Sequence, residues 1–243
     1  LSINLQNILR NILSKVPKKN TEEFRTDIKT LFKIQDMGLA RKMKDKIVTF
    51  GEIMLRLSPE NNARFTQCNA FEAVYGGGEA NTAVSLANFD VDANYVTKLP
   101  KHIIGQAAIN SLRQYGVGVD HIVRGGDQIG IYFLEKKTSQ RPTNVIYNRA
   151  GSAFALATAD DFNWDEIFDG ATWFHFSGIT PAISDEMTNI CITACQKAKE
   201  KGMTVSCDLN YRSKLWSSEK ACEAMSRICQ YVDVCIANED DAI

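Results

Sequence analysis

Several common features are missing from this sequence, and each absence bears on a class of protein. No apolar run reaches about 18 residues, so the sequence predicts no membrane span, and no signal peptide is visible. Lys and Arg (28) nearly balance Asp and Glu (29), and a net charge of −1 gives no global attraction to nucleic acid or anionic membrane. The seven cysteines form no C-x-x-C pair and are odd in number. We therefore expect reduced, mostly buried thiols in a cytoplasmic protein rather than a disulfide framework.

Two familiar phosphate loops are also missing, although the stretch AVYGGGEANTAVSLANFD is rich in glycine. The dinucleotide fingerprint fails at Asn81, which stands where its last glycine should be, and no Gly-Lys-Ser/Thr tripeptide marks a P-loop. Gly76, Gly77 and Gly78 would let a ligand approach the backbone, and the predicted helix after them offers free N–H groups. Asn81 adds a donor and an acceptor, which suits a hydroxyl better than a phosphate. Two interpretations stay open from these residues: a loop that binds a hydroxylated ligand, or a tight strand-to-helix turn.

Residues 1–42 differ in composition from the rest of the chain. They carry nine Lys/Arg against four Asp/Glu. Apolar residues follow helical spacing on both sides of Pro17, which predicts two basic amphipathic helices that could lie on a membrane or bind a partner. The alternative, which we favour, is upstream sequence joined to a domain that starts near Met43. The chain begins with Leu1 and stops at Ile243 in a predicted helical turn, so we expect both ends to be cut.

From Lys46 onward, predicted strands and helices alternate, which is typical of a mainly parallel sheet with helices on both faces. Segments near 53–75 and 129–149 break the pattern, because they are short antiparallel candidates joined by polar turns. They predict a small separate β-sheet, a lid over the strand ends where such folds bind ligands. The other expected strands are 46–51, 94–99, 119–123, 172–178, 203–210 and 232–238. The expected helices are 80–89, 104–115, one capped by Ser184, and 217–231.

Polar side chains converge on this predicted lid and on the strand ends beneath it. Tyr147 and Arg149 share one face of a lid strand because strand side chains alternate, and Tyr132 lies on the neighbouring strand. Two further strand ends contribute Asp208, Asn210, Arg212, Asn238 and Asp241. Arginine binds a carboxylate through two parallel hydrogen bonds, while tyrosine and asparagine bind hydroxyl or keto oxygens. The set therefore favours a polyhydroxylated anion as ligand. Taken singly, the tyrosines could simply pack in the lid and the arginines could be solvated surface charges.

Over nearly all of residues 46–243 the sequence resembles the ribokinase-like sugar kinases of the phosphofructokinase-B type. Within them it is most similar to the 2-keto-3-deoxygluconate kinases. The stretches that carry the resemblance are GEIMLRLSP, YGGGEANTAVSLA, VTKLP, IVRGGDQIGIYFLE, RPTNVIYNRAGSA, WFHFSGITPA, DLNYRSKLW and NEDDA. The resemblance implies an α/β fold, a three-layer α/β/α sandwich with a small β-sheet lid, truncated here at its C-terminus. It also implies ATP and Mg²⁺ as cofactors and a homo-oligomer formed through the lid.

The resemblance also implies roles for single residues. The sugar contacts would be Gly77, Gly78, Asn81, Tyr132, Tyr147, Arg149, Asn210 and Arg212. Among them, Arg212 would meet the acid group or stabilise the transferring phosphoryl group. Asn238 and Asp241 match the family's Asn-x-x-Glu element near magnesium and the nucleotide phosphates, with Asp in place of Glu, so Asp241 would act on the metal indirectly. The glycine loop would then hold sugar hydroxyls rather than a phosphate.

The sequence departs from the family pattern at a few positions. Arg56 stands where fructose and ribose kinases carry an aspartate for sugar hydroxyls, which favours an acid sugar. Asp90 follows Phe89 where the family usually has a glycine, so we expect strain in that turn. The late Asp-Thr-x-Gly-Ala-Gly-Asp motif, which supplies the anion hole and the base, has no match. RGGDQ with Asp127 is superficially similar, but its place before a lid strand predicts a hairpin turn.

Together these features predict a kinase that moves the γ-phosphoryl group of ATP to the terminal hydroxyl of 2-keto-3-deoxygluconate, giving the 6-phosphate. Two alternatives stay open. One is a related kinase of fructose or another ketose, and the other is a catalytically inactive sugar-binding fragment. Because the base motif is missing, we expect residues 1–243 alone to be inactive.

Overall fold

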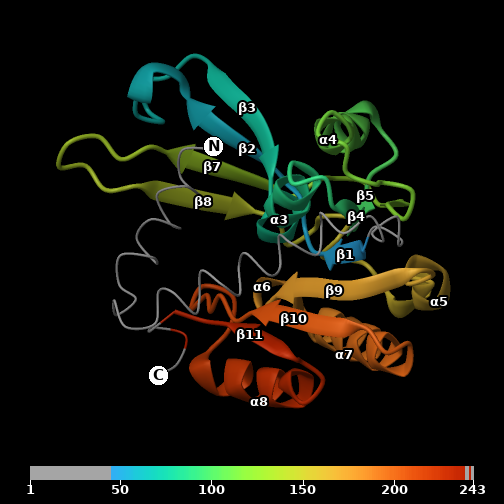
Figure 1. Cartoon of the computed structure of the whole chain (residues 1–243). Helices are drawn as coiled ribbons and strands as arrows, with labels where there is room; N and C mark the ends of the chain where they lie inside the picture. Colours follow the sequence, from blue (N-terminus) through green and yellow to red (C-terminus); the bar gives the residue numbers. More distant parts are fainter. Residues whose placement is uncertain (1–44, 239–240, 242–243) are drawn as a thin grey trace, which may run out of the picture. The chain divides into compact units, whose positions relative to one another are not determined.

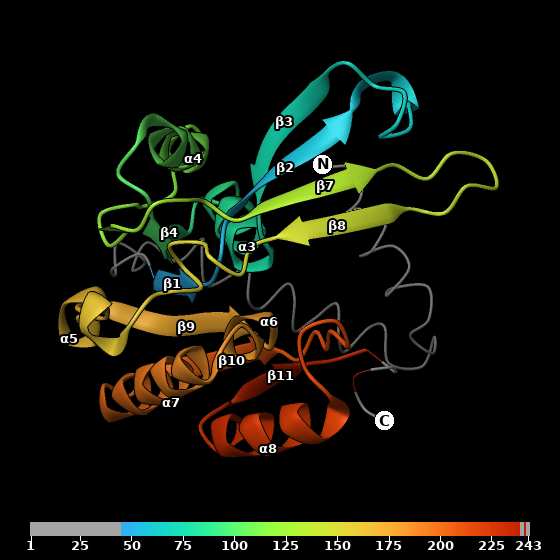
Figure 2. The ribbon, with the colours of Figure 1, turned by 180° about the vertical axis from the view of Figure 1, so that it is seen from behind.

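The computed structural model describes residues 45–238 and Asp241 (Figures 1 and 2). The chain divides after Lys44, and everything below concerns the unit that begins at Asp45. The predicted basic helices within residues 1–42, and the interpretation of this segment as joined upstream sequence, lie outside the described residues.

A five-stranded parallel sheet forms the centre of this unit, with the strand order β11-β10-β9-β1-β4 (Figure 1). Its strands are β1 (Lys46–Phe50), β4 (Asp92–Val96), β9 (Ala171–Ser177), β10 (Thr204–Asp208) and β11 (Val234–Ile236). The short strands β5 (Lys98–Leu99) and β6 (Val123–Arg124) pair separately. Parallel strands that are covered on both faces are apolar almost throughout, which is why KIVTF and TWFHFS could be predicted from the sequence.

Helices cover both faces of the central sheet. Val48, Phe50 and Phe174 project from one face and pack with Met187 of α7 (Asp185–Glu200). Tyr95 projects from the other face and packs with α3 (Gly78–Ala87) and α4 (Ile103–Arg113). The remaining helices are α5 (Trp164–Ile167), α6 (Ile179–Ala182), α8 (Ser218–Cys229) and the 3₁₀ turns η1 (Glu60–Asn62) and η2 (Ala159–Asp161). These layers confirm the predicted α/β/α sandwich.

A second sheet of four strands, here called the lid, adjoins α3 (Figure 2). Its strands are β2 (Met54–Pro59), β3 (Phe71–Gly76), β7 (Ile131–Glu135) and β8 (Asn144–Asn148), in the order β3-β2-β7-β8. The pairs β2–β3 and β7–β8 are antiparallel, while β2 and β7 run parallel. This is the small second sheet that the sequence predicts.

Three local predictions have different outcomes. The strand expected at 119–123 is wrong except for Val123, because Val119 and Ile122 are buried through a turn closed by the Ile122 N–H on the Val119 carbonyl (3.2 Å). The expected strain at Asp90 is confirmed in its geometry, since this residue has φ 61°, in the left-handed region. Asp127 lies in an exposed bend between β6 and β7, but the predicted hairpin turn is wrong, because these two strands belong to different sheets and do not pair with each other.

The cysteines are less uniformly buried than expected. All seven are free thiols, but Cys222 and Cys235 are exposed. Cys191, Cys195 and Cys207 are buried, and burial raises the pKa of Cys195 to about 12, so this thiol stays protonated at neutral pH. Among the described residues, no helix has the length and apolar character that crossing a membrane requires.

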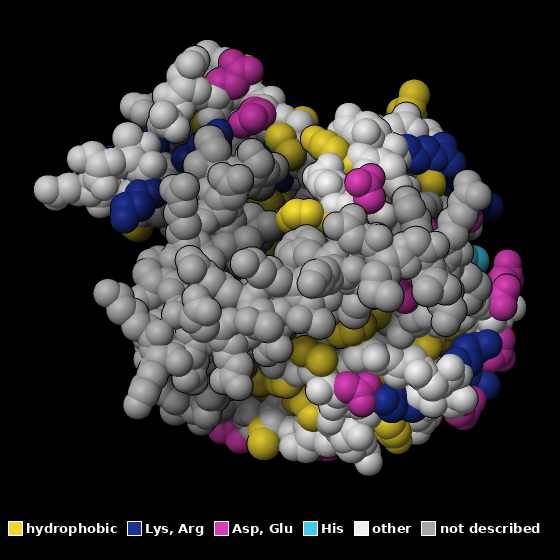
Figure 3. All heavy atoms as spheres, in the orientation of Figure 1, with side chains coloured by type: hydrophobic (Ala, Val, Ile, Leu, Met, Phe, Trp, Pro, Cys, Tyr) yellow, Lys and Arg dark blue, Asp and Glu magenta, His cyan; other side chains and the backbone are white. Residues whose placement is uncertain are grey.

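Charged side chains of both signs lie close together on the face of the described unit shown at the lower right of Figure 3, where α5 and α7 lie in Figure 1. They include the pairs of Lys197 with Asp165 (3.6 Å) and with Glu200 (3.3 Å). Exposed pairs of this kind contribute little to stability. They mark a solvated helix surface and offer no single-sign patch that would attract a polyanion.

Candidate active site

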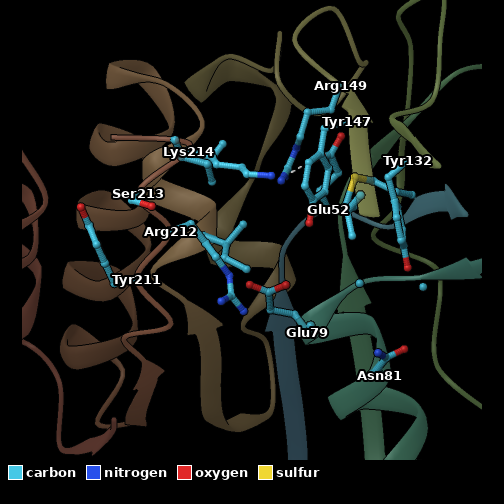
Figure 4. Close-up of a pocket in the computed structure, with 17 residues that line it drawn as sticks. Glu52, Glu79, Asn81, Tyr132, Tyr147, Arg149, Tyr211, Arg212, Ser213 and Lys214 are labelled. Atoms are coloured by element: carbon cyan, nitrogen blue, oxygen red, sulfur yellow. Dashed lines mark ion pairs between the residues drawn. The ribbon is translucent and has the colours of Figure 1, made fainter. Parts of the chain in front are cut away.

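A cavity of about 780 Å³ lies between the lid and the loops that follow β9 and β10 (Figure 4). Its lining joins five parts of the chain: the segment after β1, the glycine loop, the lid strands β7 and β8 with Arg149, the start of α6 after β9, and the loop after β10. The lining residues are Glu52, Met54, Gly76, Gly77, Gly78, Glu79, Asn81, Tyr132, Val145, Tyr147, Arg149, Ile179, Tyr211, Arg212, Ser213, Lys214 and Leu215.

Packing and ligand access explain different members of the glycine loop. A Cβ on Gly77 would collide with the carbonyl oxygen of Glu52, so this position requires glycine for close backbone packing. A Cβ on Gly78 would meet nothing within 4 Å, and Gly78 faces the cavity at the first residue of α3. This geometry is compatible with both interpretations left open by the sequence, and ligand binding stays a prediction. Gly77 is required for close packing in an extended backbone, and Gly78 leaves space beside the N–H groups of the helix start.

Glu79 fastens this loop to the central sheet. It is buried in the first turn of α3, and one carboxylate oxygen, Oε1, accepts hydrogen bonds from the Ser177 N–H (3.0 Å), the Ser177 hydroxyl (2.6 Å) and the Thr180 hydroxyl (3.1 Å). Its carboxylate fills the space that a side chain at Gly51 would occupy. A buried carboxylate with this many donors fixes the position of the helix start relative to the end of β9.

The lid contributes aromatic surface and one cation. Tyr132 and Tyr147 are cross-strand partners on β7 and β8, with ring centroids 5.8 Å apart. Arg149, just past β8, forms an ion pair with Glu52, which lies just past β1. Figure 4 shows the two tyrosines and Arg149 entering the cavity from the lid side.

Burial and charge act in opposite directions on Glu52. Burial raises the pKa of Glu52 above its ordinary value of 4.5, while the neighbouring Arg149 guanidinium and a hydrogen bond from the Ser152 hydroxyl (2.6 Å) favour the ionised form. The charge of Glu79 adds to the rise of the Glu52 pKa. Since the ion pair is direct, we assign Glu52 as the ionised partner of Arg149.

The loop after β10 supplies the opposite wall. Arg212, Ser213 and Lys214 are exposed to solvent and line the cavity, and the loop is closed by the Leu215 N–H on the Arg212 carbonyl (2.9 Å). In Figure 4 the Lys214 side chain extends toward Arg149 on the lid side, and the Arg212 side chain points toward Glu79 at the start of α3. The Tyr211 ring lies at the far side of the loop. Arg149, Arg212 and Lys214 therefore surround a space that suits an anion.

The remaining predicted residues lie beside this cavity rather than among its lining residues. Asn210 has φ 41°, and its backbone N–H helps to ionise Asp208, whose pKa is nevertheless raised by burial and by the charge of Asp241. Asp241 accepts hydrogen bonds from the N–H groups of Tyr211 (2.8 Å) and Asn238 (3.0 Å), so its carboxylate ties the loop after β10 to the end of β11.

Asp241, which the resemblance links to magnesium, already serves two backbone donors. Both carboxylate oxygens of Asp241 accept backbone N–H groups. Within residues 45–238 and Asp241, no group of three or more His, Cys, Asp or Glu side chains could hold a metal ion. The indirect role that the resemblance implies for Asp241 is compatible with these hydrogen bonds and stays a prediction.

The structure brings seven of the eight predicted sugar contacts to one cavity, all except Asn210. Sequence reasoning missed Glu52, Glu79 and Lys214. A weak signal existed for the two acids, because a charged residue follows directly after Gly51 at a strand end and after the glycine run. Arg56, which the sequence linked to acid-sugar preference, is not among the lining residues.

Comparison with known proteins bears on this geometry. The profile described as "pfkB family carbohydrate kinase" matches residues 44–242. A curated protein of Haloferax volcanii named 2-dehydro-3-deoxygalactonokinase is 39% identical over 201 residues, which cover 82% of this chain and 62% of that protein. The 2-dehydro-3-deoxygluconokinase of Bacillus subtilis is 28% identical and is covered to 55%, with 73% of this chain aligned.

Solved structures show the same likeness. The structure of 2-dehydro-3-deoxygluconokinase from Thermotoga maritima matches with a TM-score of 0.80 at 55% identity, over 81% of this chain and 60% of that chain. The chain thus spans about three fifths of the length of these relatives. Because the profile covers nearly all the residues that build the sandwich, the lid and the cavity, the chain belongs to the pfkB family of carbohydrate kinases.

Proposed function

We propose that the protein carrying this chain transfers the γ-phosphoryl group of ATP to the terminal hydroxyl of a 2-keto-3-deoxy sugar acid, with 2-keto-3-deoxygluconate as the first candidate. The observation that carries the proposal is the ring of Arg149, Arg212 and Lys214 around one cavity that also presents two tyrosines. Guanidinium groups bind carboxylates through paired hydrogen bonds, which a neutral ketose cannot use.

Each part of the cavity has a distinct task in this proposal. Arg149 binds the sugar's acid group from the lid, while the tyrosines pack on the carbon chain and hydrogen-bond to its oxygens. Gly78 and Asn81 hold hydroxyls at the start of α3. Arg212 lies on the opposite wall, where its charge would stabilise either the acid group or the phosphoryl group in transfer.

The two acids in the cavity are not assigned as the base that deprotonates the accepting hydroxyl. Glu52 is engaged with Arg149 and Ser152. Glu79 is engaged with Ser177 and Thr180. A base must be free to take a proton at hydrogen-bond distance from the substrate, and both carboxylates already serve buried donors. We infer that these acids shape the site.

The relatives named above support the choice of substrate, since both curated names and the Thermotoga structure refer to 2-dehydro-3-deoxy sugar acids. Other relatives are named fructokinases, at 26–29% identity, which keeps a neutral ketose as the competing substrate. The homo-oligomer through the lid stays a prediction. Exposed apolar side chains on the lid, Phe71 and Ile146, are compatible with it.

The test is a substrate comparison with the purified protein and magnesium ATP, using mass spectrometry to identify the phosphorylated product. We expect 2-keto-3-deoxygluconate or its galactonate epimer to be phosphorylated at the terminal carbon, with a larger kcat/KM than fructose or ribose. A larger kcat/KM for fructose would contradict the proposal and favour a ketose kinase.

A further inference from the structure

Glu52 lies where all four lid strands join the central sheet. Strand β2 begins at Met54, two residues after it. At the end of β3, the space beside Gly77 is taken by the Glu52 carbonyl oxygen. At the start of β7, the space beside Gly130 is taken by the Glu52 carboxylate. At the end of β8, Arg149 forms its ion pair with the same carboxylate.

The Glu52 carboxylate divides its two oxygens between two parts of the segment after β8. Oε2 faces the Arg149 guanidinium, and Oε1 accepts the Ser152 hydroxyl (2.6 Å). Ser152 in turn donates its N–H to the Arg149 carbonyl (2.9 Å) and accepts the Ala155 N–H (3.1 Å). The contacts therefore form a closed loop of side chain and backbone around the exit of the lid.

The pair is buried, and this makes each partner dependent on the other. The exposed fractions of the two side chains are 3% for Glu52 and 11% for Arg149. Removing one partner of a buried pair leaves an uncompensated charge, which is strongly unfavourable. Arg149 lines the cavity, and its ion pair with Glu52 engages Nη2. A guanidinium has five N–H donors, so one ion pair does not use up its capacity to bind a ligand.

We propose that Glu52 is a positioning residue that pins the base of the lid to the central sheet and orients Arg149 toward the acid group of the sugar. The orienting part rests on the proposed function, whereas the pinning of the lid does not. Glu52 touches no substrate in this proposal and acts through Arg149 and the lid strands.

The test combines a ligand-free and a ligand-bound measurement on Glu52→Gln, Arg149→Met and the double variant. Glu135→Gln is the matched control, because Glu135 is also a buried lid carboxylate, pairs with Arg141 (3.4 Å), and is not among the cavity-lining residues. Amide hydrogen exchange is followed in β7 and β8, with β10 and α7 as internal references. Titration calorimetry measures Kd for 2-keto-3-deoxygluconate and for fructose.

We expect Glu52→Gln to speed amide exchange in β7 and β8 but not in β10 or α7, and Glu135→Gln to leave exchange at the lid base unchanged. The Kd for the keto acid should rise about tenfold in Glu52→Gln, the scale of one charge-assisted hydrogen bond. The Kd for fructose should change little. In the Arg149→Met background, Glu52→Gln should leave the preference for the keto acid over fructose unchanged, because the effect of Glu52 on acid binding passes through Arg149.

If amide exchange in β7 and β8 is unchanged in Glu52→Gln, Glu52 does not fasten the lid to the central sheet. If the effects of Glu52→Gln and Arg149→Met on the preference in Kd for the keto acid over fructose add up, Glu52 does not orient Arg149. If the unmodified protein does not bind the keto acid, the proposed function fails, while amide exchange still tests whether Glu52 fastens the lid to the central sheet. If Glu52→Gln does not fold, the Arg149→Lys variant provides the test of the proposal. It keeps a cation for Glu52 but loses the fork, so lid exchange should stay near that of the unmodified protein while affinity for the keto acid falls. Fast lid exchange with unchanged affinity would contradict the proposal.

Discussion

Glu79 holds the glycine loop by accepting hydrogen bonds from donors that have few other acceptors. Its removal should therefore lower the free energy of unfolding. In Glu79→Ala, the Ser177 N–H and hydroxyl lose the acceptor that they share. The Thr180 hydroxyl keeps a long contact to the Phe50 carbonyl (3.5 Å). An unsatisfied buried donor costs about 1–3 kcal/mol, so two donors give about 2–6 kcal/mol. Water from the cavity can reach the vacated space, and we therefore expect about 2–4 kcal/mol of lost stability.

The assay is equilibrium unfolding in urea, supported by thermal denaturation. For a unit of this size the loss corresponds to a drop in Tm of about 5–15 °C, at roughly 2–4 °C per kcal/mol. Glu79→Gln keeps one acceptor oxygen and should lose about half as much stability. Glu72→Ala serves as control, since Glu72 is exposed and pairs only with Lys136 on the lid surface. A Glu79→Ala variant as stable as the Glu72→Ala control would refute the view that this carboxylate fastens the loop.

Three further predictions follow from single residues. Arg212→Lys keeps the charge but loses the fork, so kcat/KM for the keto acid should fall about tenfold in steady-state assays while that for fructose hardly changes; equal losses would contradict an acid-binding role. Burial lowers the pKa of His175 below its ordinary value of 6.5, against the opposing charges of Glu79 and Asp208. Because the unfolded chain takes up the proton more readily, the stability advantage of the unmodified protein over His175→Asn should be full above about pH 6.5 and shrink as the pH falls below it, in urea unfolding at each pH; a pH-independent difference would refute this. Asp90→Gly relieves a left-handed backbone at an exposed position and should raise stability by about 0.5–1 kcal/mol, with Asp90→Ala showing no such gain.

The sequence pattern was sufficient for features that depend on local periodicity. Buried strands such as β1 and β9 read as apolar runs, and the lid read as short strands between polar turns, so the layers of the fold could be predicted. The common face of Tyr147 and Arg149 followed from the alternation of strand side chains. The strand expected at 119–123 failed because a turn can bury Val119 and Ile122 as well as a strand can.

The two buried acids could not be placed from the sequence, for a physical reason. Glu79 and Ser177 are 98 residues apart, and Glu52 and Ser152 are 100 residues apart. Their partners become neighbours only when the parallel strands and the lid assemble. A lone glutamate at a strand end or in the first turn of a helix is ordinarily a solvated charge, and its burial depends on donors that no local pattern reveals.

Preference of the cavity for a sugar acid over a neutral ketose can be measured by binding alone, because the cavity lies within the described residues. Titration calorimetry with the purified protein should give a Kd for 2-keto-3-deoxygluconate at least about tenfold lower than for fructose, as one charge-assisted contact to Arg149 or Arg212 implies. This preference should weaken in Arg149→Lys. A protein that binds fructose as tightly as the keto acid would contradict the assignment.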